Sequence, residues 1–260
     1  MLHKPKKNLI TNSSNKLLPK SPTKLRAFKG NLELMGELYF ASLEPGDSFT
    51  TEPLILSTSL YYALGYAKGN YINFAIKKGR KSARQIPTYA EDTAEVFEKI
   101  YITPAKPIGI LEFTTELNNS RSDDYVQSNQ LSEEDEDANT PTGRFESRKQ
   151  IQPGAKFSFY VLTFDGSDPD KPPYIRLGKK RCKALVEWEE VTTSISDGVY
   201  RTTHPVLMED LESIPFGDIS FKRMQPFDVL QTGRFSGVHV KLGSEDVLPL
   251  SVRFLRRMRN

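Results

Sequence analysis

Hydrophobic and polar residues alternate in several short stretches of this chain, which is the pattern of strands with one buried face. In the first stretch, Phe28, Leu32 and Leu34 are expected to face the core. Aromatic and β-branched residues favour a strand in the stretch KFSFYVLTF as well. The expected strands span residues 25–35, 36–43, 108–116, 156–164, 174–191, 235–242 and 247–255.

Helical periodicity is clearest from Ser57 to about Lys68, where apolar residues recur on one face. Ser57 is expected to cap the N-terminus of this helix, and Gly69 is expected to stop it. Weaker helices are expected at residues 89–99 and 226–231. Strands and helices that do not strictly alternate predict an α+β fold with an antiparallel sheet.

Two segments are too polar to build a core. Residues 1–22 are basic and contain Asn, Ser and Pro, so we expect a flexible basic tail. Residues 117–141 carry few hydrophobic side chains and the acidic run Glu133–Asp137, so we expect a mobile, solvated insertion. Residues 23–260 are expected to form a single domain around this insertion.

Composition excludes several classes of protein. The chain has a formal net charge of +3 and one cysteine, Cys182, so no intrachain disulfide can form, which favours a reducing, cytoplasmic setting. With 3 histidines, a Cys/His zinc site is not expected, and no cofactor fingerprint is present. No apolar run approaches the roughly 20 residues that a membrane span needs.

Alternation and positive charge coincide in the stretch Tyr174–Lys183. If the stretch is a strand, Ile175 and Leu177 face the core, and the opposite face is cationic with one aromatic ring. That outer face carries Tyr174, Arg176, Gly178 and Lys180. RNA bases can stack on the tyrosine while the cations neutralise phosphates. The pattern fits equally well an edge strand that Lys and Arg protect from aggregation.

A second basic segment, residues 143–153, carries Arg144, Arg148 and Lys149 and is expected to be a flexible loop. Such a loop suits phosphate binding, and a solvated linker explains the same composition. Thr232–Gly237 is a faint glycine loop, although such a sequence more often marks a turn.

Catalysis has few candidate residues in the folded part. General acid–base cleavage of RNA needs a positioned His or a Lys with a lowered pKa. His204 precedes Pro205 in an expected loop, and His239 lies in an expected strand. An endoribonuclease would use one of these histidines, or Lys180, together with a tyrosine.

Four markers occur in a characteristic order along the chain: Glu37–Gly65, Tyr101–Pro107, Gly143–Leu162 and Pro173–Glu187. Together they resemble the Csc-one subunits of type I-D CRISPR effector complexes, which belong to the Cas-five group. The resemblance extends over Leu25–Leu255, so it leaves out the basic tail, and the acidic insertion also falls outside it.

The resemblance implies a ferredoxin-like, RNA-recognition-type core with long insertions. It also implies a subunit that holds the 5′ handle of the guide RNA at the foot of the complex. The implied partners are a Cas-seven-like backbone subunit and a Cas-ten-type large subunit, near the place where target DNA is first opened. A direct contact with that DNA stays open. Guide maturation belongs in this group to a separate Cas-six-type endonuclease.

We therefore expect a non-catalytic subunit that binds guide RNA for antiviral defence, with no metal and no cofactor. Tyr174 is the candidate stacking platform. The candidate phosphate ligands are Arg144, Arg148, Lys149, Arg176, Lys179, Lys180 and Arg181. The chain departs from the family pattern in its Lys179–Arg181 run and in its vestigial glycine-rich loop. The alternatives are a metal-independent endoribonuclease that processes guide precursors and a purely structural bridging subunit.

Overall fold

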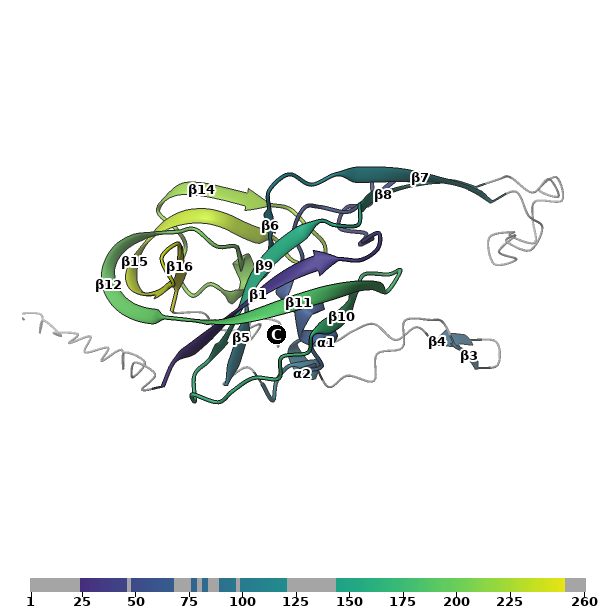
Figure 1. The fold of residues 1–260 in the computed structure, drawn as a ribbon. Coiled ribbons are helices and arrows are strands. Elements are labelled where there is room, and N and C mark those ends of the chain that lie inside the picture. Colours follow the sequence, from purple (N-terminus) through teal and green to yellow (C-terminus); the bar gives the residue numbers. More distant parts are fainter. Residues whose placement is uncertain are drawn as a thin grey trace, which may run out of the picture.

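The computed structural model describes residues 24–45, 48–67, 76–78, 81–83, 89–96, 99–120 and 144–250 (Figure 1). The expected basic tail, residues 121–141 of the acidic insertion and residues 251–260 lie outside the described residues. The expected antiparallel α+β architecture is confirmed, because antiparallel sheets make up most of the described chain and the helices are few and short.

The main sheet lies at the centre of the molecule (Figure 1). Its neighbouring strands all pair antiparallel. In spatial order they are β10 (Tyr174–Leu177), β11 (Cys182–Val191), β1 (Arg26–Leu34), β9 (Lys156–Thr163) and β5 (Ile100–Ile102), and β6 (Lys106–Ile108) also pairs with β9.

Strand β9 is buried on both faces, which explains its nearly continuous apolar sequence. Phe159 belongs to the core on the helix side of the sheet, whereas Tyr160 and Leu162 belong to the core shared with the second sheet. The Phe159 ring packs directly onto Gly30 of β1, where an added Cβ would lie 2.5 Å from the ring. A side chain at Gly30 would therefore displace the aromatic ring from the core.

The second sheet covers the other face of the main sheet. Its central strand β15 (Val229–Leu242) pairs with β12 (Thr193–Thr202), β13 (Val206–Leu207), β14 (Gly217–Lys222) and β16 (Asp246–Pro249). A short 3-10 helix, Met208–Asp210, follows β13.

Two predictions are wrong in this region. The expected helix at 226–231 is absent, because Val229 and the residues after it are already paired in β15. The expected glycine loop at Thr232–Gly237 lies inside the same strand, where it pairs with β12.

A small sheet contains the segment that we expected to be a flexible loop. Strand β8 (Arg144–Ile151) lies between β2 (Ser48–Thr50) and β7 (Phe113–Ser120). The loop prediction at 143–153 is therefore wrong, and β7 includes residues 117–120, where we expected the acidic insertion to begin. In the expected 108–116 strand, Ile108 and Ile110 are 46% and 97% exposed, so neither belongs to the core. A separate pair is formed by β3 (Ile76–Lys78) and β4 (Lys81–Ala83).

Helix α1 (Ser57–Ala63) packs beside β10 and β5, with the short α2 (Tyr89–Asp92) on the same side of the main sheet (Figure 1). The helix is shorter than expected, because Gly65 adopts a φ of +80° just beyond its C-cap. Leu56, not Ser57, occupies the N-cap position.

Candidate nucleic-acid interface

The basic stretch forms a hairpin and not the single strand expected at 174–191. Strands β10 and β11 pair antiparallel, and Gly178–Arg181 connects them. Gly178 and Arg181 both adopt positive φ angles, of +72° and +53°. Left-handed backbone at these two positions reverses the chain, so Lys179 and Lys180 lie at the tip of the hairpin.

The expected alternation is confirmed within β10. Ile175 and Leu177 are buried in the core, whereas Tyr174 and Arg176 are exposed. Tyr174 is 49% exposed, so its ring is available to a ligand. Because the strand is at the edge of the main sheet, its outer side has no neighbouring strand among the described residues.

Lys183 is a member of this surface that our candidate set omitted. The hairpin register places it opposite Arg176, on the same face of the sheet. Its Nζ lies 4.0 Å from the centroid of the Tyr174 ring. The signal was present in the sequence, since Lys183 ends the same basic stretch, but the hairpin was needed to bring it beside Arg176.

The tip of the hairpin is anchored to the segment after β1. The Lys179 amide donates a hydrogen bond to the Tyr39 carbonyl oxygen at 2.9 Å. At Gly178, an added Cβ would lie 2.6 Å from the same oxygen. The Lys179 ammonium lies 5.8 Å from the Tyr39 ring and 5.9 Å from the Phe49 ring, within reach of cation–π attraction.

Some of the expected phosphate ligands already contact carboxylates. Lys180 Nζ lies 2.7 Å from Glu116 Oε2 and 3.5 Å from Glu37 Oε2. The hydrogen bond from Lys180 lowers the pKa of Glu116, so that carboxylate stays charged. Arg148 forms a two-pronged contact with Glu146, at 2.8 and 3.1 Å. A phosphate at Lys180 or Arg148 would therefore compete with a neighbouring carboxylate.

Of the remaining candidates, Lys149 and Arg144 lie in the small sheet, whereas Arg181 lies in the hairpin connection. Lys149 Nζ lies 4.2 Å from the Phe113 ring centroid in the small sheet. The backbone of Arg144 pairs with Ser120 at the end of β8, and its side chain lies outside the described residues. Arg181 is exposed, and its carbonyl oxygen accepts a hydrogen bond from Arg176 Nη1 at 3.3 Å.

The structure thus separates the candidate cations that contact a carboxylate, Lys180 and Arg148, from those that do not among the described residues. Within the described part of the chain, the members of one group have no ion pair with a carboxylate, and they share the exposed hairpin with Tyr174. That group, which we call the hairpin cations, consists of Arg176, Lys179, Arg181 and Lys183.

Two cavities lie beside the hairpin. The first, of about 350 Å³, opens between β10, α1 and the Met224–Pro226 segment. The second, of about 420 Å³, is a more open hollow alongside β10 that includes Tyr174 and Lys183. Both cavities are lined by Tyr62, Ala63 and Arg176, so they adjoin each other.

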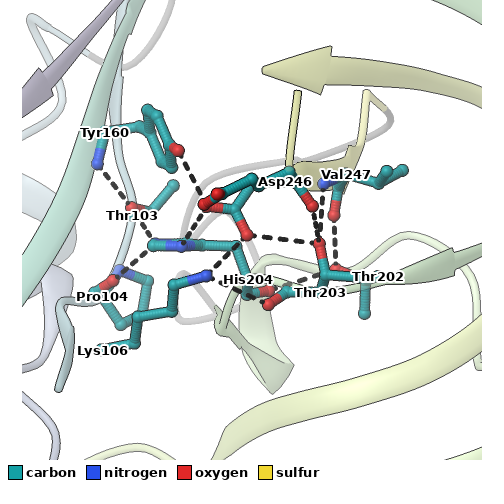
Figure 2. A network of polar contacts seen from close by, with 10 residues as sticks. Thr103, Pro104, Lys106, Tyr160, Thr202, Thr203, His204, Asp246 and Val247 are labelled. Carbon is teal, nitrogen blue, oxygen red and sulfur yellow. Dashed lines mark hydrogen bonds and ion pairs between the residues drawn. The ribbon is translucent and has the colours of Figure 1, made fainter. Parts of the chain in front are cut away.

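The catalytic candidate His204 is buried at the joint between the two larger sheets (Figure 2). Its Nε2 lies 2.8 Å from Thr103 Oγ1 and 3.0 Å from the Pro104 carbonyl oxygen. On the other side of the ring, Nδ1 is 3.7 Å from Asp246 Oδ2, which is too long for a hydrogen bond. Burial lowers the pKa of His204, and the nearby carboxylate only partly opposes this shift.

Asp246 is the centre of the same buried network (Figure 2). It accepts hydrogen bonds from Lys106 Nζ at 2.6 Å and from the Tyr160 hydroxyl at 2.8 Å. Burial would raise the pKa of Asp246, but the contacts with His204, Lys106 and Tyr160 outweigh burial and hold the pKa below its usual value. Through these contacts, β6 and β9 of the main sheet are joined to β16 of the second sheet, so the network stabilises the packing of the two sheets.

The second catalytic candidate, His239, is also enclosed. It is 5% exposed and stacks on Tyr200 with ring centroids 4.3 Å apart. In the part of the chain that the structure describes, no group of three or more His, Cys, Asp or Glu side chains is arranged to hold a metal ion. Among the same residues, no helix has the length and hydrophobicity that crossing a membrane requires.

Comparison with known proteins yields one family. The family model for type I-D CRISPR-associated protein Cas5/Csc1 matches residues 25–257. No curated protein matches the chain. A chain in the cryo-EM structure of the Type III-B Cmr-beta complex bound to cognate target RNA and AMPPnP is 11% identical, with a TM-score of 0.45 over 80% of this chain and 86% of that chain.

A CRISPR protein from Archaeoglobus fulgidus is 15% identical, with a TM-score of 0.36 over 85% of this chain and 97% of that chain. The family assignment rests on the family model, which covers residues 25–257.

Proposed function

The chain belongs to the type I-D CRISPR-associated Cas5/Csc1 family, and from this premise we propose that it holds the 5′ handle of the guide RNA in the effector complex without cleaving it. The β10–β11 hairpin is the contact surface. The handle is bound as a single strand, and the Cas-seven-like and Cas-ten-type subunits are the protein partners.

One observation carries this proposal: the hairpin cations share one hairpin with an exposed tyrosine and have no carboxylate partner among the described residues. Arg176 and Lys183 face each other across the hairpin, and Lys183 lies over the Tyr174 ring. Single-stranded nucleic acid is bound by this combination, in which cations follow the phosphates and an aromatic ring stacks on a base. A protected edge strand needs charge, but it needs neither an exposed ring nor two cations side by side.

The proposal of a ferredoxin-like core is supported by the connectivity of the main sheet. Along the chain, β1 is followed by α1, β5, β9 and β11. In the sheet these strands lie in the order β11-β1-β9-β5, with antiparallel neighbours. A split β-α-β unit of this kind is the first half of the ferredoxin-like pattern. In chain order, β10 lies between β9 and β11, at the place where the ferredoxin-like pattern has its second helix.

The burial of both histidine candidates supports binding over cleavage. An acid or base must reach the proton that it transfers, and His204 is 0% exposed. The bridging role is compatible with RNA binding and has support of its own on the second sheet. Ile214 and Phe216, which precede β14, and Phe221 within it are 87%, 61% and 52% exposed, and they offer apolar area to a protein neighbour.

The test is a charge-removal pair with a matched control. We expect Arg176→Ala combined with Lys183→Ala to lower guide occupancy of the assembled complex. It should also reduce the salt slope of handle binding by about 1.4, since each phosphate contact on a single strand contributes about 0.7. Arg201→Ala combined with Lys241→Ala removes the same charge from the exposed second sheet and should change neither quantity.

Equal guide occupancy and equal slopes in the two double variants would refute the hairpin as the contact surface. Crosslinking from the guide to this chain separates RNA binding from a purely bridging role. Incubation of the purified protein with repeat RNA in EDTA tests the endoribonuclease alternative, because a defined product that disappears in a His→Ala variant would overturn the proposal.

A further inference from the structure

The cavity of about 350 Å³ beside the hairpin has walls suited to a flat ring. Phe40, Tyr62 and Tyr89 contribute aromatic surface, and Tyr62 and Tyr89 contact each other edge to face with centroids 6.1 Å apart. A second edge-to-face contact, from Tyr89 to the buried Phe227 at 5.5 Å, holds this wall against the core. These contacts hold the Tyr62 and Tyr89 rings in place without a ligand.

The volume limits what the cavity can hold. Small-molecule sites generally measure about 300–1,000 Å³, so this cavity lies at the lower end of that range. It has room for one ring system with its attached sugar. The adjoining hollow, which includes Tyr174 and Lys183, is open and shallow by comparison, and it suits the continuing strand.

Polar groups at the cavity are placed to pair with the edge of a ring. Gln225 lines the cavity, and its backbone amide is fixed by a hydrogen bond to the Ser42 carbonyl oxygen at 2.9 Å. Its side-chain amide is exposed, has no hydrogen-bond partner among the described residues, and offers both a donor and an acceptor. Ser59 adds a hydroxyl from α1. Apolar walls with a few polar groups are what a base-binding pocket requires.

Arg176 connects this cavity to the hairpin cations. It lines both the cavity and the adjoining hollow, so a phosphate between a base in one and a nucleotide in the other lies beside its guanidinium. A guanidinium suits this position because its planar fork binds phosphate oxygens in pairs. An inserted amino-acid side chain from a protein partner would fill the cavity but would leave this cation without a counter-charge.

We propose that the cavity holds one unstacked nucleobase of the guide RNA handle, with Gln225 reading the edge of the base and Arg176 neutralising the phosphate next to it. This inference rests on the proposed function, because it names the part of the RNA that the hairpin surface presents to the cavity. One handle position is then recognised by its base, whereas its neighbours are held through their backbone.

The test uses the assembled complex and a set of guide RNAs in which each handle position in turn is abasic. With the wild-type protein, we expect one position to weaken guide binding about 5- to 150-fold, the range that stacking of a single base contributes. In Ala63→Phe the new ring fills the cavity, so guide binding should weaken and the same abasic position should cause no further loss. Thermal unfolding of the complex reports whether this variant folds.

Gln225→Ala is a second variant that does not depend on repacking, because Gln225 is exposed. It should reduce the preference for the natural base at the one sensitive position and leave the other positions unchanged. Gln231→Ala, at an exposed position on the second sheet, is the matched control and should keep the full preference.

The outcomes separate this inference from the proposed function. If every abasic guide binds as well as the intact guide, while Arg176→Ala with Lys183→Ala still weakens binding, the base pocket is refuted and handle binding stands. If the cavity receives a partner's side chain, Ala63→Phe will impair subunit assembly without any dependence on the abasic position, which also refutes the pocket. If the guide RNA does not contact the wild-type protein in the complex, both the base pocket and the proposed handle binding are refuted.

Discussion

The close approach of Gly178 to the Tyr39 carbonyl oxygen makes Gly178→Ala the sharpest test of how the interface is built. An alanine there must hold a φ of +72° and place its Cβ 2.6 Å from that oxygen. The left-handed conformation costs about 1–2 kcal/mol for an L-residue, and forcing an extra carbon into a packed site costs about 1–3 kcal/mol more. Keeping the native tip therefore costs about 2–5 kcal/mol.

Releasing the tip is cheaper. It gives up the hydrogen bond from the Lys179 amide, which contributes about 1 kcal/mol. It also gives up the exposed ion pair between Lys180 and Glu116, which contributes about 0–1 kcal/mol. We therefore expect Gly178→Ala to detach the tip, with a loss of about 1–2 kcal/mol in the free energy of unfolding and a marked loss of handle binding.

Gly243→Ala is the control for backbone strain alone. Gly243 has a φ of +60°, but an added Cβ would meet nothing within 4 Å. It should lose about 1–2 kcal/mol of stability and keep its RNA affinity. Urea unfolding, hydrogen exchange at the Lys179 amide and handle binding are measured on both variants. If Gly178→Ala retains the protection of that amide and the full RNA affinity, the reasoning about the close approach is refuted.

Two further predictions concern charge. Glu116→Gln removes the carboxylate nearest Lys180, so the salt slope of handle binding should rise by about 0.7; an unchanged slope would mean that Lys180 does not meet the RNA. Burial lowers the pKa of His204, so below about pH 6.5 the unfolded chain takes up a proton that the folded chain does not. Stability should fall by up to about 1.4 kcal/mol per pH unit as the pH drops below that value. His204→Gln should remove this component, and identical pH slopes in unfolding experiments on the two proteins would contradict it.

Local alternation in the sequence predicted the parts of the interface that depend on one strand. The inward Ile175 and Leu177 and the outward Tyr174 and Arg176 follow from the period of two, whatever the neighbouring strands are. The strand β9 was predicted from its aromatic and β-branched residues, but its burial on both faces was not. Periodicity failed at the turn, because the left-handed Arg181 is not a usual turn residue.

The environment of the cations was beyond sequence reasoning, because it depends on distant residues. Lys180 meets Glu116, which is 64 positions away, and this pair decides that Lys180 is neutralised while Arg176 is not. Arg148 appeared to lie in a flexible loop because its strand partners, β2 and β7, are contributed by remote segments. A sequence shows that cations are present, but only the fold shows which of them a carboxylate already contacts.

Alternation along the chain indicates a basic, half-buried stretch with an aromatic ring, and the order of the four markers resembles that of a family of CRISPR subunits. Tertiary structure decided that the stretch is a hairpin, that Lys183 stands beside Arg176, and that a cavity lies next to both. The physical reason is the range of the interactions. Alternation is a property of neighbouring residues, whereas a cavity exists only where Phe40, Tyr62 and Gln225 are brought together from segments far apart in the chain.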